Sequence, residues 1–171
     1  MSSSHPAQPS TTTSGTTSHV AGGAAGSRSL LVSASPAATS AGLLVLRLVL
    51  AVVMIAHGAQ KIFTFTLDGT ASSFTDMGVP AASVTGPALA IFELVGGIVL
   101  LLGLGTRLVA ALNAAAMVGA LVIVHLDAGF FAADGGYELV LVLIAASVAL
   151  VLTGPGAWSA DTLLARRSTR R

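Results

Sequence analysis

Four long apolar runs constrain this chain more than any other feature of its sequence. They cover residues 41–63, 87–104, 107–126 and 137–154, and Gly and Pro residues interrupt the segments between them. Each run approaches the roughly 20 residues that a helix needs to cross the hydrocarbon core of a bilayer. Lipid offers the backbone no hydrogen-bonding partner, so runs of this length are helices rather than open strands. The sequence predicts an all-α membrane protein built as a four-transmembrane-helix bundle.

Charge and cysteine content narrow the class of protein further. Charged residues make up 9% of the chain, whereas soluble domains carry about 25%. So few charges could not cover a surface that faces water. The chain has no cysteine, which excludes disulfides, thiolate metal sites and thiol redox chemistry. Any redox role therefore requires a bound or a diffusing cofactor.

The composition divides the chain into three parts. Residues 1–40 are rich in Ser, Thr and Gly, and we predict a disordered cytoplasmic tail because such a segment buries too little apolar surface to order itself. Residues 41–156 form the transmembrane domain, and residues 157–171 an interfacial, basic C-terminal tail. Four spans place both termini on one side, which then holds most of the basic residues: Arg28, Arg47, Arg107, Arg166, Arg167, Arg170 and Arg171. The positive-inside tendency predicts that both termini are cytoplasmic.

Titratable residues recur at the opposite, outer ends of the four runs. His57 and Lys61 lie near the end of the first run, and Glu93 lies about 9 Å below the outer end of the second. His125 ends the third run and Glu138 begins the fourth. Ionisable groups inside a membrane are costly and usually mark pairs or pathways. We therefore expect side chains from separate helices to meet in one polar cluster in the outer leaflet.

Helical spacing suggests how this cluster is paired. His57 and Lys61 are four residues apart and share a face of their helix, so either could be the partner of Glu93. Other interpretations stay open, with Lys61 as an interfacial anchor, His125 as an interfacial belt residue and Glu138 as a helix-dipole partner. In the inner half, we expect Arg47 and Arg107 to reach lipid headgroups. We expect Asn113 to join two helices by a hydrogen bond.

Several motifs occur together and in register along residues 41–161: "HGAQKIF", "FELVGGIVLLLGLGTR", "VHLDAGFFAADGGYELVL" and "LTGPGAWSAD". With these motifs the chain resembles the DoxX family of four-helix bacterial integral membrane proteins. The resemblance implies the bacterial plasma membrane and a link to membrane quinones, respiratory electron transfer or defence against oxidative stress. The recurrent polar positions of the family match six residues here: His57, Lys61, Glu93, Arg107, His125 and Glu138.

The leading hypothesis is a quinone-interacting redox subunit. His57 and Glu93 are the candidate catalytic residues, acting as proton donors or relays, while Lys61, His125, Glu138 and Arg107 are candidates for substrate contact or for the surrounding network. The sequence has no nucleotide-binding loop or flavin signature, so electrons would come from a soluble redox partner. The sequence does not identify a cofactor: quinone is a candidate, and haem or a metal is not expected because the histidine spacings match no ligand motif.

Two other functions remain open at the level of sequence. The same residues could serve a proton-coupled transporter of a small solute, which would require a homo-oligomer because four helices make a thin carrier. The chain could also be a non-catalytic scaffold that anchors a soluble redox enzyme at the membrane, with its basic end contacting anionic lipid or an acidic partner.

Overall fold

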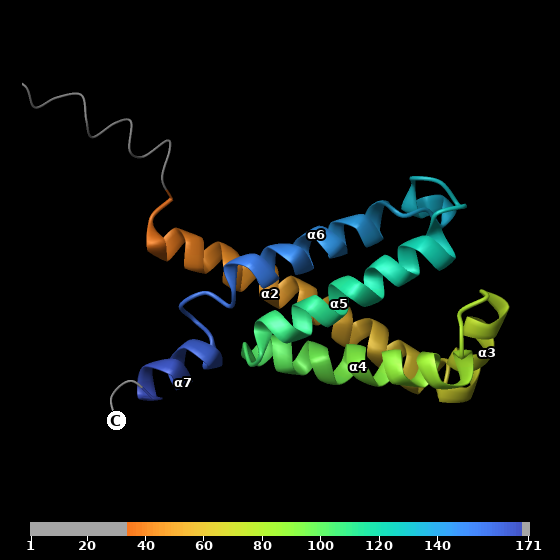
Figure 1. Cartoon of the computed structure of the whole chain (residues 1–171), viewed down its shortest axis with the longest axis horizontal. Coiled ribbons are helices and arrows are strands. Elements are labelled where there is room, and N and C mark those ends of the chain that lie inside the picture. Colours follow the sequence, from red (N-terminus) through yellow and green to blue (C-terminus); the bar gives the residue numbers. More distant parts are fainter. Residues whose placement is uncertain (1–33, 169–171) are drawn as a thin grey trace, which may run out of the picture. The chain divides into compact units, whose positions relative to one another are not determined.

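In the computed structural model, which describes residues 34–168, every regular element is helical (Figure 1). The long helices are α2 (Pro36–Ala59), α4 (Ala82–Leu102), α5 (Thr106–Ala120) and α6 (Glu138–Thr153). Shorter helices are α3 (Leu67–Asp76), α7 (Ala160–Ser168) and the 3₁₀ turn η3 (Ala132–Asp134). Two π-helical turns, η1 (Gln60–Thr64) and η2 (Leu121–His125), continue α2 and α5. The all-α prediction is confirmed, while most of the predicted disordered tail lies outside the described residues.

Within residues 34–168, three helical segments are long and apolar enough to cross a membrane. They are Pro36–Thr64, Ala82–Leu102 and Thr106–His125, with 29, 21 and 20 residues. The fourth predicted span corresponds to α6, which is apolar but has only 16 residues. The outward faces of these helices carry many exposed Val, Leu and Ile side chains, as helices surrounded by lipid do. The fourth crossing stays a prediction.

Two helices begin earlier than the apolar runs suggest. α2 begins at Pro36, because the Ser35 hydroxyl accepts a hydrogen bond from the Ala38 backbone and proline suits the first turn. α4 begins at Ala82 and continues through Pro87, the residue at which the predicted run begins. Glu93 consequently lies 11 residues into its helix, or about 16 Å from its start. The acid is therefore deeper than the predicted 9 Å.

The segment between the first two spans contains a helix that the apolar runs did not predict. The Thr66 hydroxyl caps α3 by accepting from the Gly69 backbone at 3.2 Å. α3 packs against α4, where a methyl group on Gly86 would come within 3.2 Å of the Ala71 backbone. This close approach holds α3 against the N-terminal end of α4.

The spans pack in pairs, α2 along α4 and α5 along α6. A tight turn joins α4 to α5, and its Gly103 and Gly105 adopt left-handed backbone angles that glycine accommodates without strain. From this turn the two helices diverge (Figure 1). A core of seven apolar residues fills the region near the turn: Leu50, Ala51, Met54, Leu100, Val109, Ala110 and Leu150. The pairs are therefore closely packed near the turn and open away from it.

The C-terminal segment returns to the α4–α5 turn after α6. The Asp161 backbone donates to the Gly103 carbonyl at 3.0 Å, and its carboxylate accepts from the backbone amides of Gly105 and Thr106. Those amides begin α5 and have no partner within the helix, so the carboxylate caps it. α6 and the segment after it thus run back alongside α5 to the end at which α5 begins.

Candidate functional site

A buried ion pair joins the first and second spans. Lys61 Nζ lies 2.5 Å from Glu93 Oε2, and the two side chains are 17% and 5% exposed. Glu93 is therefore almost fully enclosed and depends on Lys61 to compensate its charge, while the Lys61 side chain stays partly exposed. Of the two pairings that the sequence left open, the structure has Lys61, rather than His57, bound to Glu93.

Close helix packing and a π-helical turn bring the two charges together. Gly58 lies one turn before Lys61, and a methyl group there would clash with the Leu94 backbone and come within 2.9 Å of the Ala90 carbonyl. The absence of a side chain therefore lets α2 approach α4 next to Glu93. The π turn η1 carries Lys61, and the Lys61 carbonyl accepts from the Thr70 hydroxyl at 2.9 Å. α3 thereby fixes the backbone that presents the lysine.

Two histidines are held in defined orientations by backbone carbonyls. His57 Nδ1 lies 2.9 Å from the Val53 carbonyl, and His125 Nδ1 lies 2.7 Å from the Gly135 carbonyl. A carbonyl oxygen can only accept, so Nδ1 carries the proton in both rings and Nε2 is the basic nitrogen of the neutral form. Each ring can therefore exchange a proton through Nε2.

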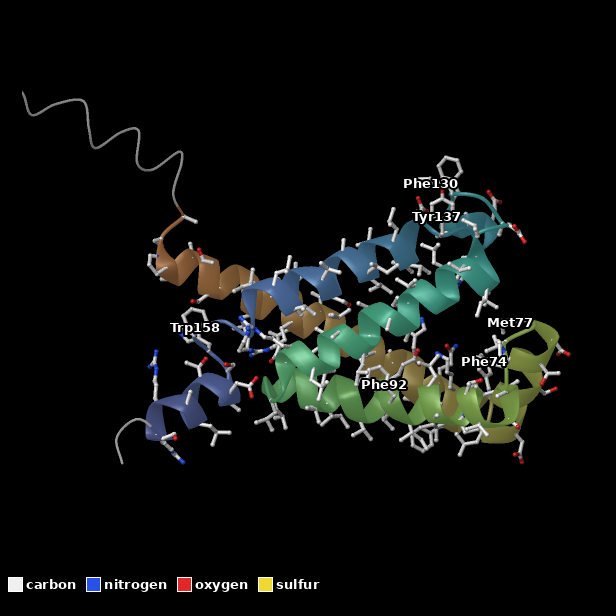
Figure 2. All side chains as sticks on the ribbon, viewed as in Figure 1. Phe74, Met77, Phe92, Phe130, Tyr137 and Trp158 are labelled. Atoms are coloured by element: carbon white, nitrogen blue, oxygen red, sulfur yellow. The ribbon has the colours of Figure 1, made fainter. Side chains whose placement is uncertain are left out.

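The ion pair and both histidines line a single cavity of about 410 Å³. Its walls come from α2, α3, α4, α5, the 126–137 loop and α6. Phe74 of α3 and Met77, which directly follows α3, also line it and are labelled in Figure 2. Most of the remaining wall is aliphatic, and the volume lies in the range of about 300–1,000 Å³ typical of ligand pockets. The cavity thus combines an apolar wall with a few convergent polar groups.

The buried amide on the third span has a structural partner. Asn113, which also lines the cavity, donates to the Ser147 hydroxyl at 2.9 Å, joining α5 to α6. The Ser147 hydroxyl in turn donates a hydrogen bond to the Leu143 carbonyl at 2.7 Å. The prediction that Asn113 links two helices is confirmed.

Two of the predicted site residues, Glu138 and Arg107, lie outside this cavity. Glu138 accepts a 2.7 Å hydrogen bond from the Ala132 backbone and so closes the loop beside Phe130 and Tyr137, whose rings stack edge to face (Figure 2). Arg107 is exposed at the start of α5, about 27 Å along the helix from His125. Neither side chain lines the cavity.

Arg47 does not lie where the sequence predicted. It is buried against the segment that follows α6, a contact that the sequence did not indicate. The side chain is 3% exposed, and it donates to the carbonyls of Pro155 and Trp158 at 2.8 Å each. The expectation that it reaches lipid headgroups is therefore wrong. The segment that follows α6 supplies carbonyl acceptors inside the protein. The position of one arginine in the middle of a helix did not predict that this segment packs against it.

Metal-binding groups do not gather in the described part of the chain. Across residues 34–168, no three His, Asp or Glu side chains lie close enough together to hold a metal ion. The titratable groups of the cavity are instead one ammonium, one carboxylate and two imidazoles. Such a set can donate hydrogen bonds and pass protons to a bound molecule.

Comparisons with known proteins agree on one family. The family model described as DoxX matches residues 42–126. The candidate oxidoreductase CatD of Bacillus subtilis is 34% identical over 113 residues, which are 66% of this chain and 79% of CatD. The uncharacterized membrane protein Rv3486 of Mycobacterium tuberculosis is 32% identical over 134 residues, which are 72% of this chain and 82% of that protein. No solved structure matches.

Proposed function

The chain belongs to the DoxX family of membrane proteins, and on that basis we propose that it is a quinone-interacting redox subunit of the bacterial plasma membrane. The observation that carries the proposal is the buried Lys61–Glu93 pair in a cavity that also holds His57 and His125. The name of the relative CatD, a candidate oxidoreductase, supports the reaction class. In this proposal both termini are cytoplasmic and the cavity lies toward the outer leaflet.

The cavity residues suit the chemistry of a quinone ring. Reduction to the quinol adds two electrons and two protons to the two ring carbonyls. The Lys61 ammonium can donate a hydrogen bond to one carbonyl and stabilise the negative charge that develops on it. Glu93 and His57 can then relay protons to the ring oxygens. The electrons come from a separate redox protein, because the sequence has no nucleotide-binding loop of its own.

An acid-to-amide substitution tests the proposal. Glu93→Gln keeps the size of the side chain and an oxygen that accepts from Lys61, but it removes the charge and the carboxylate that could take up and release a proton. We expect this variant to accumulate in the membrane at the normal level while quinone-linked reduction, measured in membranes that contain native partners, falls at least tenfold. His57→Ala should lower the rate in the same direction.

A matched control uses another acid. Asp134 is exposed in the loop before α6 and does not line the cavity, so Asp134→Asn should retain the full rate. Normal quinone-linked activity in both Glu93→Gln and His57→Ala would remove the proposed function. Affinity purification in mild detergent, followed by mass spectrometry, would identify the electron-donating partner and any bound quinone.

A further inference from the structure

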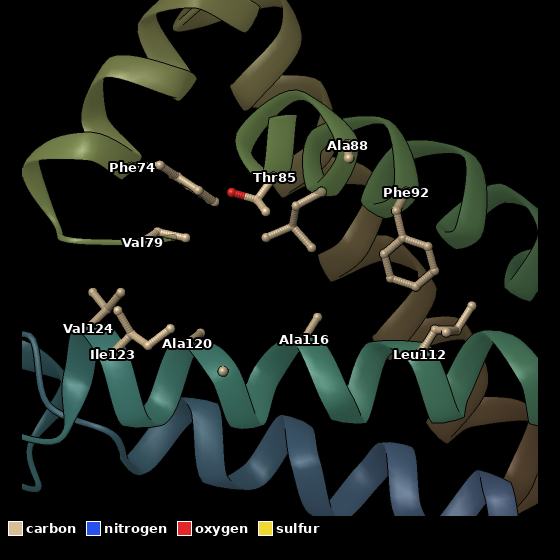
Figure 3. Close-up of a pocket in the computed structure, with 12 residues that line it drawn as sticks. Phe74, Val79, Thr85, Ala88, Phe92, Leu112, Ala116, Ala120, Ile123 and Val124 are labelled. Atoms are coloured by element: carbon tan, nitrogen blue, oxygen red, sulfur yellow. The ribbon is translucent and has the colours of Figure 1, made fainter. Parts of the chain in front are cut away.

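A second hollow lies between α4 and α5 where these helices diverge. It has a volume of about 400 Å³ and is lined from α3, α4, α5 and η2. Figure 3 shows Phe92 of α4 and Ala116 of α5 pointing into the space between the two helices. Thr85 is the only polar side chain among its twelve lining residues. We call this hollow the α4–α5 groove.

The α4–α5 groove adjoins the cavity that holds the ion pair. Four residues line both spaces: Phe74, Leu89, Ala120 and Val124. The two spaces are therefore separated by single side chains rather than by a helix. An elongated molecule can place one end beside Lys61 and Glu93 and its other end in the groove.

The lining chemistry selects a molecule with two different ends. An apolar hollow of this kind offers water no hydrogen-bonding partners, so an apolar chain fills it best. In the cavity, by contrast, the described wall residues include one ammonium and one carboxylate that already neutralise each other. A head with a full negative charge, such as a phosphate, would find no free counter-ion in this pair, because Glu93 already neutralises the Lys61 ammonium. A neutral head with carbonyl oxygens can accept from Lys61 and needs no counter-ion.

We propose that the α4–α5 groove holds the isoprenoid chain of a quinone whose ring occupies the Lys61–Glu93 cavity. This inference rests on the proposed function and adds the route by which the ligand is held. Quinones reside in the hydrocarbon layer, and the groove lies on the open side of the diverging helices. The chain thus lies between α4 and α5 while the ring reaches the ion pair past Phe74 and Leu89.

Two quinones that differ only in the chain test the inference. The probes are menadione, which has a ring and no isoprenoid chain, and a menaquinone with a short isoprenoid chain. Binding of each is titrated to the full-length protein in lipid nanodiscs. Ala116→Phe fills the groove, and Ala115→Phe on the exposed face of the same helix is the matched control, because Ala115 lines neither space.

We expect Ala116→Phe to weaken binding of the menaquinone about tenfold, the equivalent of about 1.4 kcal/mol, and to leave the Kd of menadione within twofold. Ala115→Phe should change neither. Equal effects on both quinones, or no effect on either, would overturn the inference while leaving the proposed function standing. Failure of the wild-type protein to bind either quinone would instead count against the proposed function itself.

One further result would assign the groove to a different occupant. If Ala116→Phe reduced the phospholipid that co-purifies with the protein, measured by native mass spectrometry, and left menaquinone binding unchanged, the groove would hold a phospholipid acyl chain. That outcome contradicts the proposal. Thermal unfolding of both alanine variants shows whether a loss of binding reflects misfolding, in which case Gly119→Leu, on the same groove wall, replaces Ala116→Phe.

Discussion

At the scale of single residues, Lys61 and Glu93 are unequal members of their pair. The carboxylate of Glu93 is 5% exposed on a short side chain in the middle of α4. The ammonium of Lys61 is 17% exposed near the end of its span, and its long stem can carry the charge outward. Removing the lysine therefore leaves the buried Glu93 carboxylate without a counter-ion. Removing the acid leaves the Lys61 ammonium, which can move toward water.

This asymmetry predicts the stability of three variants. Lys61→Met should lower the free energy of unfolding by about 3 kcal/mol, because a buried carboxylate loses its counter-ion. Glu93→Leu should cost about 1 kcal/mol, since the freed ammonium can reorient. The double variant Lys61→Met/Glu93→Leu should unfold close to the wild type. Thermal unfolding in detergent, followed by circular dichroism, measures all three, and strictly additive losses would contradict the coupling.

The sequence predicted that this cluster forms but not how it is paired. Counting residues along alternating spans placed five residues at the same end: His57, Lys61, Glu93, His125 and Glu138. The first four line one cavity, and Glu138 does not. Which of His57 and Lys61 pairs with Glu93 depends on how the end of the first span is rotated about its axis. The α-helical period places His57 and Lys61 on one face of the first span. Residues 60–64 instead form a π turn, which has more residues per turn. The period of an isolated segment does not reveal such a turn.

At the scale of helices, the approach of α2 to α4 depends on small residues at the contact. Besides Gly58, Gly97 of α4 lies so close to α2 that a methyl group there would come within 2.9 Å of the Ile55 backbone. Helices in lipid associate through this kind of close packing, because no hydrophobic effect drives them together. The contact surface around the ion pair is therefore set by positions that carry no side chain.

Substituting one of these glycines should separate the helices. Gly58→Ala places a methyl group against backbone atoms of Ala90 and Leu94 that cannot rotate away, and we expect a loss of about 2 kcal/mol in the free energy of unfolding. Gly42→Ala is the control on the same helix, because nothing lies within 4 Å of its added methyl group. It should be neutral or slightly stabilising. Equal melting temperatures for the two variants would refute the role of Gly58.

α3 illustrates a helix that local sequence could not predict. Its segment, "LDGTASSFTD", contains two large apolar residues, Leu67 and Phe74, which are too few to form an apolar stripe. The helix is instead stabilised by the Thr66 cap and by packing against Gly86 of α4. Phe74 then reaches both the cavity and the α4–α5 groove. Tertiary contacts rather than propensity thus place a wall of the candidate site.

At the scale of the whole molecule, the charges distinguish the two ends of the helices. Arg47, together with the exposed arginines Arg107, Arg166 and Arg167, lies at or beyond the end marked by the α4–α5 turn. Lys61 is the basic residue of the opposite end and is neutralised by Glu93. The positive-inside tendency assigns the arginine-rich end to the cytoplasm. In the orientation that we propose, the candidate cavity opens in the outer half of the membrane.

This orientation requires α6 to cross the bilayer although it is short. Its 16 residues span about 24 Å, several ångströms less than the hydrocarbon core of about 30 Å. Local thinning of the bilayer accommodates such a mismatch at modest cost. The hydrogen bonds of Asp161 to the α4–α5 turn and of Arg47 to Pro155 and Trp158 return the chain to the end where α5 begins. α6 therefore has to traverse the same height as α5.

The absence of cysteine from the chain makes the crossing directly testable, because an introduced cysteine is the only thiol present. Ala133→Cys lies in the exposed turn before α6, and Ser168→Cys at the exposed end of α7. With a membrane-impermeant maleimide on intact cells, we expect Ala133→Cys to be labelled and Ser168→Cys to react only after the cells are permeabilised. Ser72→Cys, exposed on α3, should behave like Ala133→Cys. Labelling of both Ala133→Cys and Ser168→Cys on intact cells would mean that α6 does not cross. Labelling of Ser168→Cys alone would mean that the orientation is inverted.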